Sequence, residues 1–184
     1  MDKVKMFEST DSALRDSRES SDLVKCRDAF RIIMSGVSYD WLISGTTVGC
    51  SYDFTLKVHD KSKCCGEIKC RTSYIAKYNR IPLNADKFTG LRRNRPSGLR
   101  LLYLAIYPDE WYLFDIDKCS KELTLECLED WKTKYVEYEK EGSNLGEYWC
   151  PTIWLPKTQA IFSGLCENGE IILTGITSDK SCTG

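Results

Sequence analysis

The sequence is poor in several features that would indicate particular classes of protein. It has one histidine, His59, and none of its ten cysteines belongs to a C-x-x-C pair, which argues against a zinc finger built from local ligand pairs. No apolar run approaches the roughly 20 residues of a membrane span, and the first residues lack the apolar core of a secretory signal. These absences predict a chain that works in the cytoplasm, or in a nucleus if its source is eukaryotic or viral, without membrane contact.

The cysteines are scattered along the chain, and without an export signal they are expected to be reduced thiols that serve as small apolar residues. Cys26, Cys70 and Cys127 fall where apolar residues are expected. A zinc site assembled from four distant cysteines stays open as an alternative. In that case the chain would be a cysteine-rich zinc-binding module.

Length and composition indicate one domain. The chain has 184 residues, of which 42% are hydrophobic and 29% charged, as in ordinary mixed α/β proteins. Residues 1–18 are polar and weakly patterned, so we expect a mobile N-terminal arm followed by a single domain over residues 19–184. The apolar spacing after Ser20 predicts a helix up to Met34, ended by Gly36.

Two segments with alternating apolar and polar residues flank a polar turn and predict a β-hairpin. Asp53 lies in the first segment, Glu67 and Lys69 lie in the second, and the turn is centred near Asp60 and Lys61. Antiparallel pairing about this turn brings Asp53 level with Glu67 and Lys69. Two acids and a lysine are therefore expected to converge at one end of the hairpin.

This combination of side chains is the one that a metal-dependent phosphodiesterase needs. Asp53 and Glu67 supply the carboxylate oxygens that hard divalent cations prefer. Lys69 would lie beside the attacking water and the charge that develops on phosphorus. The bland alternative is a hairpin whose polar face only keeps the sheet soluble.

With these residues in place, the sequence resembles the PD-(D/E)xK nuclease superfamily over roughly residues 20–116. Tyr52 stands where the motif often has proline. The resemblance implies a restriction-endonuclease-like core, in which a central mixed β-sheet is flanked by helices, with residues 117–184 as a C-terminal extension. It also implies that Asp53 and Glu67 bind Mg²⁺ or Mn²⁺, that the Ile68 carbonyl adds a ligand, and that Lys69 positions the nucleophilic water.

In that superfamily the opening helix often carries a further acid near the metal. The candidates in this sequence are Glu19, Asp22 and Asp28. The favoured alternative for each is an ordinary charge on the surface of a helix.

A basic stretch follows the Glu-x-Lys strand. Residues 77–100 hold seven lysines and arginines against one acid, and residues 109–141 hold eleven acids against five lysines. Clustered cations bind the phosphates of a polyanion through release of counterions. We expect nucleic-acid contacts from Lys87, Arg92, Arg93 and Arg95, with a solvated helix face as the alternative.

The remaining patterns predict further elements with less detail. Val37–Ile43 is expected to form a short strand, residues 74–82 a loop, and Leu83–Arg93 a short helix capped by Asn84. The apolar run 99–107 predicts a strand buried on both faces, and Trp111–Ile116 its antiparallel neighbour. Residues 128–138 are predicted to form an acidic helix, and Trp149–Leu155 and Ile171–Leu173 a peripheral strand pair.

The leading hypothesis is a Mg²⁺-dependent endonuclease that cuts nucleic acid, with DNA preferred, of the phage, mobile-element or defence type. A nuclease-like domain that has lost turnover and binds nucleic acid or protein is the alternative. A homodimer stays open, because two cuts in a duplex usually require two sites.

Overall fold

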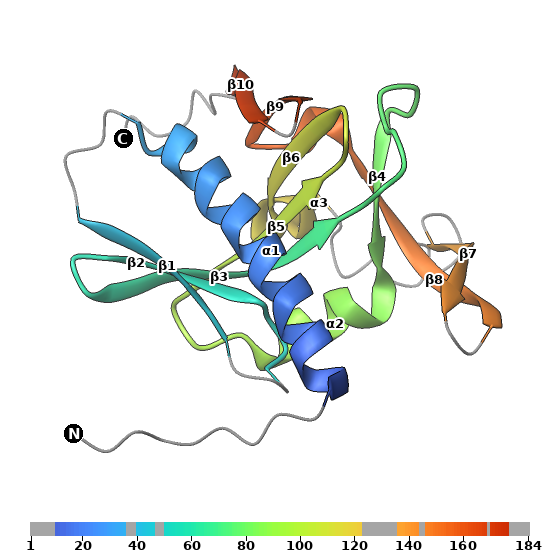
Figure 1. Cartoon of the computed structure of the whole chain (residues 1–184), viewed down its shortest axis with the longest axis horizontal. Coiled ribbons are helices and arrows are strands. Elements are labelled where there is room, and N and C mark those ends of the chain that lie inside the picture. Colours follow the sequence, from blue (N-terminus) through green and yellow to red (C-terminus); the bar gives the residue numbers. More distant parts are fainter. Residues whose placement is uncertain are drawn as a thin grey trace.

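The computed structural model shows a mixed α/β protein whose main feature is a curled, seven-stranded mixed sheet shaped like half of a barrel (Figure 1). It describes residues 10–35, 40–46, 50–122, 136–143, 146–168 and 170–176. No helix in these ranges is long and apolar enough to cross a membrane.

Helices and short strands cover the two faces of the large sheet. The helices are α1 (Thr10–Ile33), α2 (Ala85–Asn94) and α3 (Ile116–Glu122), with a 3-10 turn, η1 (Lys157–Gln159). The large sheet has the order β1 (Trp41–Gly45), β2 (Phe54–Val58), β3 (Lys61–Cys70), β5 (Arg100–Ile106), β6 (Glu110–Asp115), β9 (Phe162–Glu167) and β10 (Glu170–Ile176). A three-stranded sheet has the order β4 (Arg80–Asn84), β8 (Gly146–Pro156) and β7 (Val136–Ser143).

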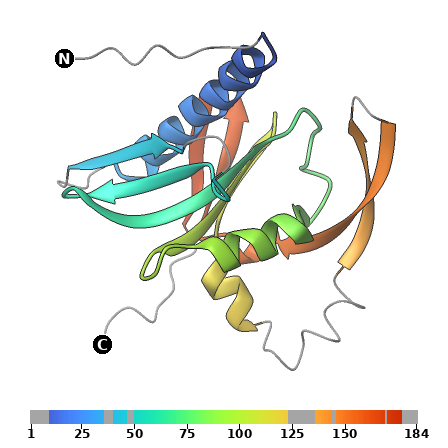
Figure 2. The same ribbon diagram turned by 90° about the horizontal axis from the view of Figure 1, so that it is seen from below.

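The large sheet separates two hydrophobic clusters. On one face α1 packs Cys26, Ala29 and Phe30 against Phe54 and Leu104 of the sheet. The other face is covered by α2 and the small sheet, as Figures 1 and 2 show. The molecule is therefore layered, with the candidate site on the α2 face of β3.

Strand β5 lies in the middle of the large sheet, parallel to β3 and antiparallel to β6. Its residues Leu101, Tyr103 and Ala105 enter the α2 cluster, and Leu102, Leu104 and Ile106 enter the α1 cluster. The prediction that this apolar run is buried on both faces is confirmed, as is its antiparallel pairing with the following strand.

Two predicted elements differ from the structure near the N-terminal half. Helix α1 begins at Thr10, so the expected end of the arm at residue 18 falls inside the helix. Strand β4 occupies the end of the segment expected to be a loop. Pro82 hid it, because proline suits only strands at a sheet edge, which is where β4 lies.

The C-terminal third also departs from expectation. Residues 136–138 begin β7 rather than end an acidic helix, since the alternation of Glu137, Glu139 and Glu141 with other residues has the period of a strand. The rest of that predicted helix lies outside the described residues. Trp149–Leu155 lies in β8 and pairs with β4 and β7, whereas Ile171–Leu173 lies in β10 of the other sheet, so the predicted pair is wrong.

Two glycines give a matched test of the packing. An added Cβ at Gly164 of β9 would lie 1.7 Å from the Ile172 carbonyl oxygen and 2.3 Å from Trp111 Nε1, whereas at Gly90 of α2 it would meet nothing within 4 Å. We expect Gly164→Ala to lower the free energy of unfolding by about 3 kcal/mol. Gly90→Ala should raise it by about 0.5–1 kcal/mol, because alanine favours a helix. Urea unfolding measures both, and equal stabilities would contradict the described packing of β9.

Candidate functional site

The β2–β3 hairpin sets the position of the first candidate acid. Its turn consists of His59 and Asp60, whose φ angles of 49° and 59° are those of a two-residue hairpin turn. Phe54 pairs with Gly66, and just before it the Asp53 N–H donates to the Gly66 carbonyl at 2.8 Å. The predicted alignment of Asp53 with Glu67 is confirmed.

The Asp53 side chain is held at the end of the hairpin. Its Oδ2 accepts a hydrogen bond from the Ile68 N–H at 2.9 Å, and its Oδ1 lies 4.0 Å from Lys87 Nζ. Since the N–H and carbonyl of one strand residue point to the same side, the Ile68 carbonyl also faces the Asp53 side of β3. The Asp53 side chain is 40% exposed, so solvent reaches the site from this side.

Glu67 lies deeper, with a side chain that is only 12% exposed. Burial and, after it, the neighbouring Asp53 carboxyl group raise the pKa of this carboxyl to about 8, although Lys87 acts in the opposite direction. Lys87 Nζ lies 2.8 Å from Glu67 Oε2. That oxygen is buried, and the Lys87 ammonium is the positive charge beside it.

The first turn of α2 delivers Lys87 to the acids. Asn84 caps the helix by accepting the Lys87 N–H on Oδ1 at 3.0 Å, as predicted from the sequence. Leu83, Phe88 and Leu91 are buried beside it, which fixes α2 against the sheet. The ammonium thus lies closest to Glu67 and within 4.0 Å of Asp53, in the place that a bound cation would share.

Lys69 lies on the same side of β3 as Glu67, two residues further along the strand, and is exposed. Within the described part of the chain no hydrogen bond or ion pair joins it to Asp53 or Glu67. The lysine that the structure brings to the acid pair is therefore Lys87, and Lys69 stands at the rim of the site.

The two acids fit a hard divalent cation. They offer carboxylate oxygens on adjacent strands, and they already accommodate a positive charge in Lys87. In the described ranges no three His, Cys, Asp or Glu side chains gather into a metal cluster. Mg²⁺ is commonly held by one or two carboxylates, with water and substrate phosphate completing its coordination, so a pair is sufficient.

The further acids proposed for α1 lie on the other face of the sheet or on the surface. Asp22 contacts the Cys70 thiol, whose pKa is raised first by burial and then by this carboxylate. Asp28 forms an exposed ion pair with Arg31 at 2.9 Å. Glu19 lies within α1, and its side chain is outside the described set. None of these observations brings a third acid to Asp53 and Glu67.

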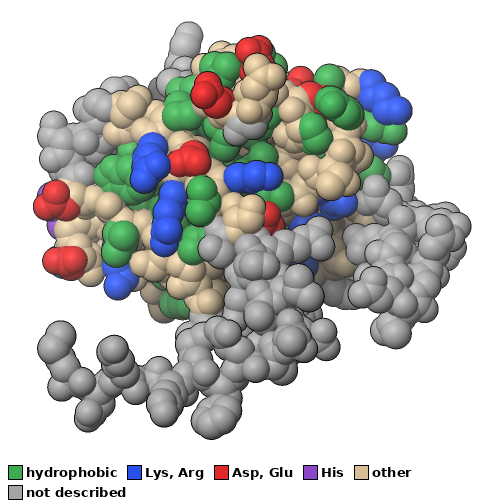
Figure 3. All heavy atoms as spheres, viewed as in Figure 1, with side chains coloured by type: hydrophobic (Ala, Val, Ile, Leu, Met, Phe, Trp, Pro, Cys, Tyr) green, Lys and Arg blue, Asp and Glu red, His purple; other side chains and the backbone are tan. Residues whose placement is uncertain are grey.

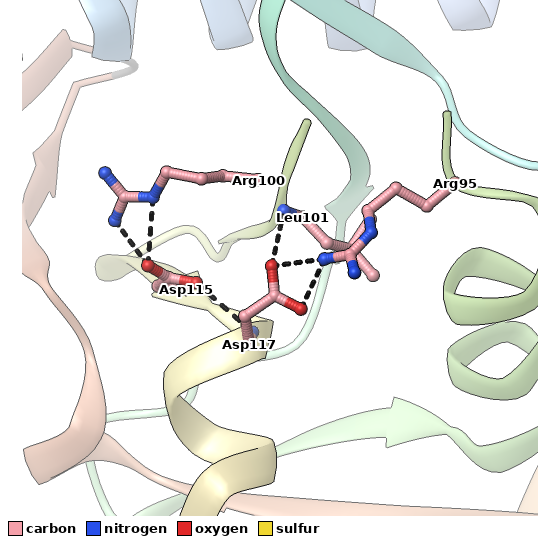
Figure 4. Close-up of polar contacts among 5 residues, drawn as sticks. All are labelled: Arg95, Arg100, Leu101, Asp115 and Asp117. Carbon is pink, nitrogen blue, oxygen red and sulfur yellow. Dashed lines mark hydrogen bonds and ion pairs between the residues drawn. The ribbon is translucent and has the colours of Figure 1, made fainter. Parts of the chain in front are cut away.

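The predicted nucleic-acid contacts divide into two kinds. Arg93 is exposed near the end of α2, and the Arg92 guanidinium lies 5.6 Å from the Phe88 ring, with its charge toward solvent. Arg95 instead forms an ion pair with Asp117, whose Oδ2 also accepts the Leu101 N–H at 3.3 Å (Figure 4).

A second arginine of the basic stretch is engaged next to it. Arg100 pairs with the buried Asp115, and Asp115 Oδ1 accepts the Asp117 N–H at 3.2 Å at the start of α3 (Figure 4). These contacts join the ends of α2, β5 and β6. Sequence reasoning missed them, because the acids belong to a separate acidic stretch that only the β5–β6 pairing brings near.

The cysteines are distributed over both layers. Cys26, Cys64, Cys65 and Cys119 are buried, and Cys127 lies outside the described residues. Desolvation raises the pKa of the Cys65 thiol to about 11 and that of Cys70 to about 12, so these thiols stay protonated at neutral pH.

Comparison of the chain with family models, curated proteins and solved structures finds no match.

The raised pKa of Glu67 has a consequence for stability. From its ordinary value of 4.5 up to about 8, the folded protein retains a proton that the unfolded chain has lost, so stability should fall as pH rises through this window. Glu67→Gln, which cannot ionise, should flatten that slope in chelator. The control is Glu167→Gln, an exposed acid of β9. Urea unfolding at several pH values measures the slope. The same slope in the wild type and the Glu67→Gln protein would contradict the burial of this carboxyl group.

Proposed function

We propose that the chain is a Mg²⁺-dependent endonuclease with a restriction-endonuclease-like core, acting on DNA phosphodiesters. The observation that carries the proposal is the convergence of Asp53 and Glu67 from paired strands around one positive charge. Burial of Glu67 beside a second carboxyl group raises its pKa to about 8, and a cation bound between the two acids would favour their ionised forms. Such arrangements gather at functional sites.

In this proposal Asp53, Glu67 and the Ile68 carbonyl hold the metal ion. When bound, Mg²⁺ would lower the pKa of a coordinated water and offset charge on the phosphate. The chain's own residues supply position. The Ile68 N–H fixes the orientation of Asp53 at 2.9 Å, and the cluster of Phe88 and Leu91 holds α2 over Glu67.

The two lysines would have different roles. Lys69 is exposed beside Glu67 and is free to approach the attacking water and the phosphate. Lys87 balances the acids in the metal-free chain, and when a divalent cation takes that place its ammonium would turn toward a substrate phosphate. A hinge is not needed for this exchange, because a lysine side chain has four rotatable bonds of its own.

One observation favours the second candidate, a nuclease-like domain that binds nucleic acid without turnover. Lys87 already neutralises Glu67 at 2.8 Å, so the acid pair has a charge partner without any metal. If that ion pair persists in Mg²⁺, no metal ion binds and no cleavage occurs, but the basic surface can still bind nucleic acid.

Cleavage of supercoiled plasmid, linear duplex, single strands and RNA in Mg²⁺ and Mn²⁺ tests the proposal. Lys69→Ala should slow single-turnover cleavage by at least ~10²-fold with Mn²⁺ binding intact, because its charge acts only in the transition state. Asp53→Asn should abolish both Mn²⁺ binding and cleavage. Lys61→Ala, an exposed lysine at the far end of the same strand, is the control and should cleave at the wild-type rate. Nucleic-acid binding without cleavage by the wild type would establish the second candidate.

The two kinds of arginine give a paired test of the basic surface. Arg93→Gln should weaken binding and reduce the slope of log affinity against log salt by about one unit, the loss of one phosphate contact. Arg95→Gln should leave the slope unchanged and instead lower the free energy of unfolding by about 1 kcal/mol or less, since its partner is the half-exposed Asp117. Salt titration of nucleic-acid binding in Ca²⁺ and urea unfolding distinguish the two roles. The same salt slope and the same stability in both variants would refute the distinction between Arg93 and Arg95.

A further inference from the structure

The loop of residues 71–79 connects the motif strand β3 to β4 and is held firmly at its centre. Ile75 is buried, and its N–H donates to both carboxylate oxygens of Asp109 at 3.0 and 2.9 Å, while the Ala76 N–H donates at 2.7 Å. Desolvation raises the pKa of Asp109, but the hydrogen bonds from backbone N–H groups outweigh it and lower the pKa below its usual value. Lys157 Nζ donates to the Ile75 carbonyl at 3.0 Å. The backbone of this loop is thus fixed although its rim is exposed.

Two tyrosines project from this fixed backbone into solvent. Tyr74 is 70% exposed and Tyr78 is 48% exposed, and they are the most exposed aromatic side chains in the described part of the chain. Tyr74 precedes the buried Ile75 and Tyr78 follows it by three residues, and neither tyrosine belongs to the two hydrophobic clusters. An exposed aromatic ring on a rigid support has most of its face available for stacking, and it loses little conformational freedom when something stacks on it.

Cations lie along this loop and at the start of β4. Lys77 Nζ lies 5.0 Å from the centre of the Tyr78 ring, and the Arg80 guanidinium lies 5.2 Å from the Trp154 ring of β8. From Ile68 to Ala85 the sequence contains four lysines and arginines and no aspartate or glutamate. Figure 3 shows lysine or arginine side chains beside hydrophobic ones at the upper right, where this loop precedes β4 in Figure 1.

We propose that the 71–79 loop is a stacking platform for single-stranded nucleic acid, a proposal that rests on the proposed function and names the form of substrate the site takes. Bases expose their aromatic faces only when unpaired, so Tyr74 and Tyr78 would stack on a single strand and not on an intact duplex. Lys77 and Arg80 contact the phosphates on either side. A protein or lipid partner would be expected to meet a broader apolar surface, whereas here Lys77 lies beside the Tyr78 ring and the neighbouring Asp109 carboxylate is engaged by the Ile75 and Ala76 N–H groups.

The platform is joined to the candidate site by a short, rigid path. Strand β3 runs from Glu67 past Lys69 into the loop, and β4 returns from the loop directly into α2 and Lys87. Five residues of strand span about 16 Å. A bound strand of a few nucleotides could therefore stack on the tyrosines and also reach the acid pair, so the platform would set the distance between an unpaired segment and the cut.

Binding in chelator tests the platform without cleavage. Fluorescence anisotropy would compare a DNA single strand of about 12 nucleotides (within the range of site sizes of single-strand binders), the matching duplex, and RNA of the same sequence. The double variant Tyr74→Leu/Tyr78→Leu should weaken single-strand affinity by about tenfold or more, because each stacked base contributes substantially. Tyr74→Phe/Tyr78→Phe keeps both rings and should retain wild-type affinity. Duplex affinity should change little in either variant.

Three results would overturn the proposal: no single-strand binding by the wild type, equal affinity in the leucine variant, or an equal loss for the duplex. The comparison of DNA with RNA decides which single strand is preferred. Photocrosslinking of a bromouracil-containing strand, followed by mapping of the attached peptide to residues 71–80, checks the contact in the unmutated protein. Cleavage assays separate this proposal from the proposed function. If the wild type does not cleave but the leucine variant loses single-strand binding, the platform stands and the nuclease is rejected. If the wild type cleaves and the leucine variant binds single strands as the wild type does, the nuclease stands and the platform is rejected.

Discussion

The close contact of β3 with both of its neighbours is the constraint on which the rest of the structure depends. At Gly66 an added Cβ would lie 2.5 Å from the Leu102 carbonyl of β5 and 2.6 Å from the Phe54 ring of β2. Only glycine allows these three strands to approach in this way. The same residue accepts the Asp53 N–H, so core packing and the position of the first acid are decided at one point. A shift of register by one residue would turn Glu67 toward α1 and dismantle the acid pair.

Ion pairs link the elements that meet on the α2 face of the large sheet. Glu67 and Lys87 link β3 to α2, Arg95 and Asp117 link the end of α2 to α3, and Arg100 and Asp115 link β5 to β6. Each pair places a cation of the basic stretch against an acid from elsewhere. The strong separation of charge along the sequence is thus partly cancelled in the folded chain, whereas Lys77, Arg92 and Arg93 of the basic stretch stay exposed.

Features governed by local chemistry could be predicted from the sequence. The hairpin followed from strand alternation, the start of α2 from the Asn84 cap, and the burial of β5 from its apolar run. Features that depend on distant partners could not. β4 is a strand only because β8 lies beside it, and Arg95 looked like a phosphate contact until Asp117 was placed next to it. Lys87 was expected to contact nucleic acid, and its ion pair with Glu67 depends on how α2 packs on the sheet.

The ion pair between Glu67 and Lys87 also bears on how the protein is made. Chains whose acidic or thiolate ligands repel one another until metal arrives fold only in its presence, as small zinc domains do. Here Lys87 supplies a positive charge beside the acids without a metal ion, so the proposed metal is not needed to offset their repulsion during folding. In the proposed nuclease, a metal ion would bind to the folded protein by displacing the Lys87 ammonium. When the metal ion dissociates, the ammonium would return to the acids and the protein would stay folded.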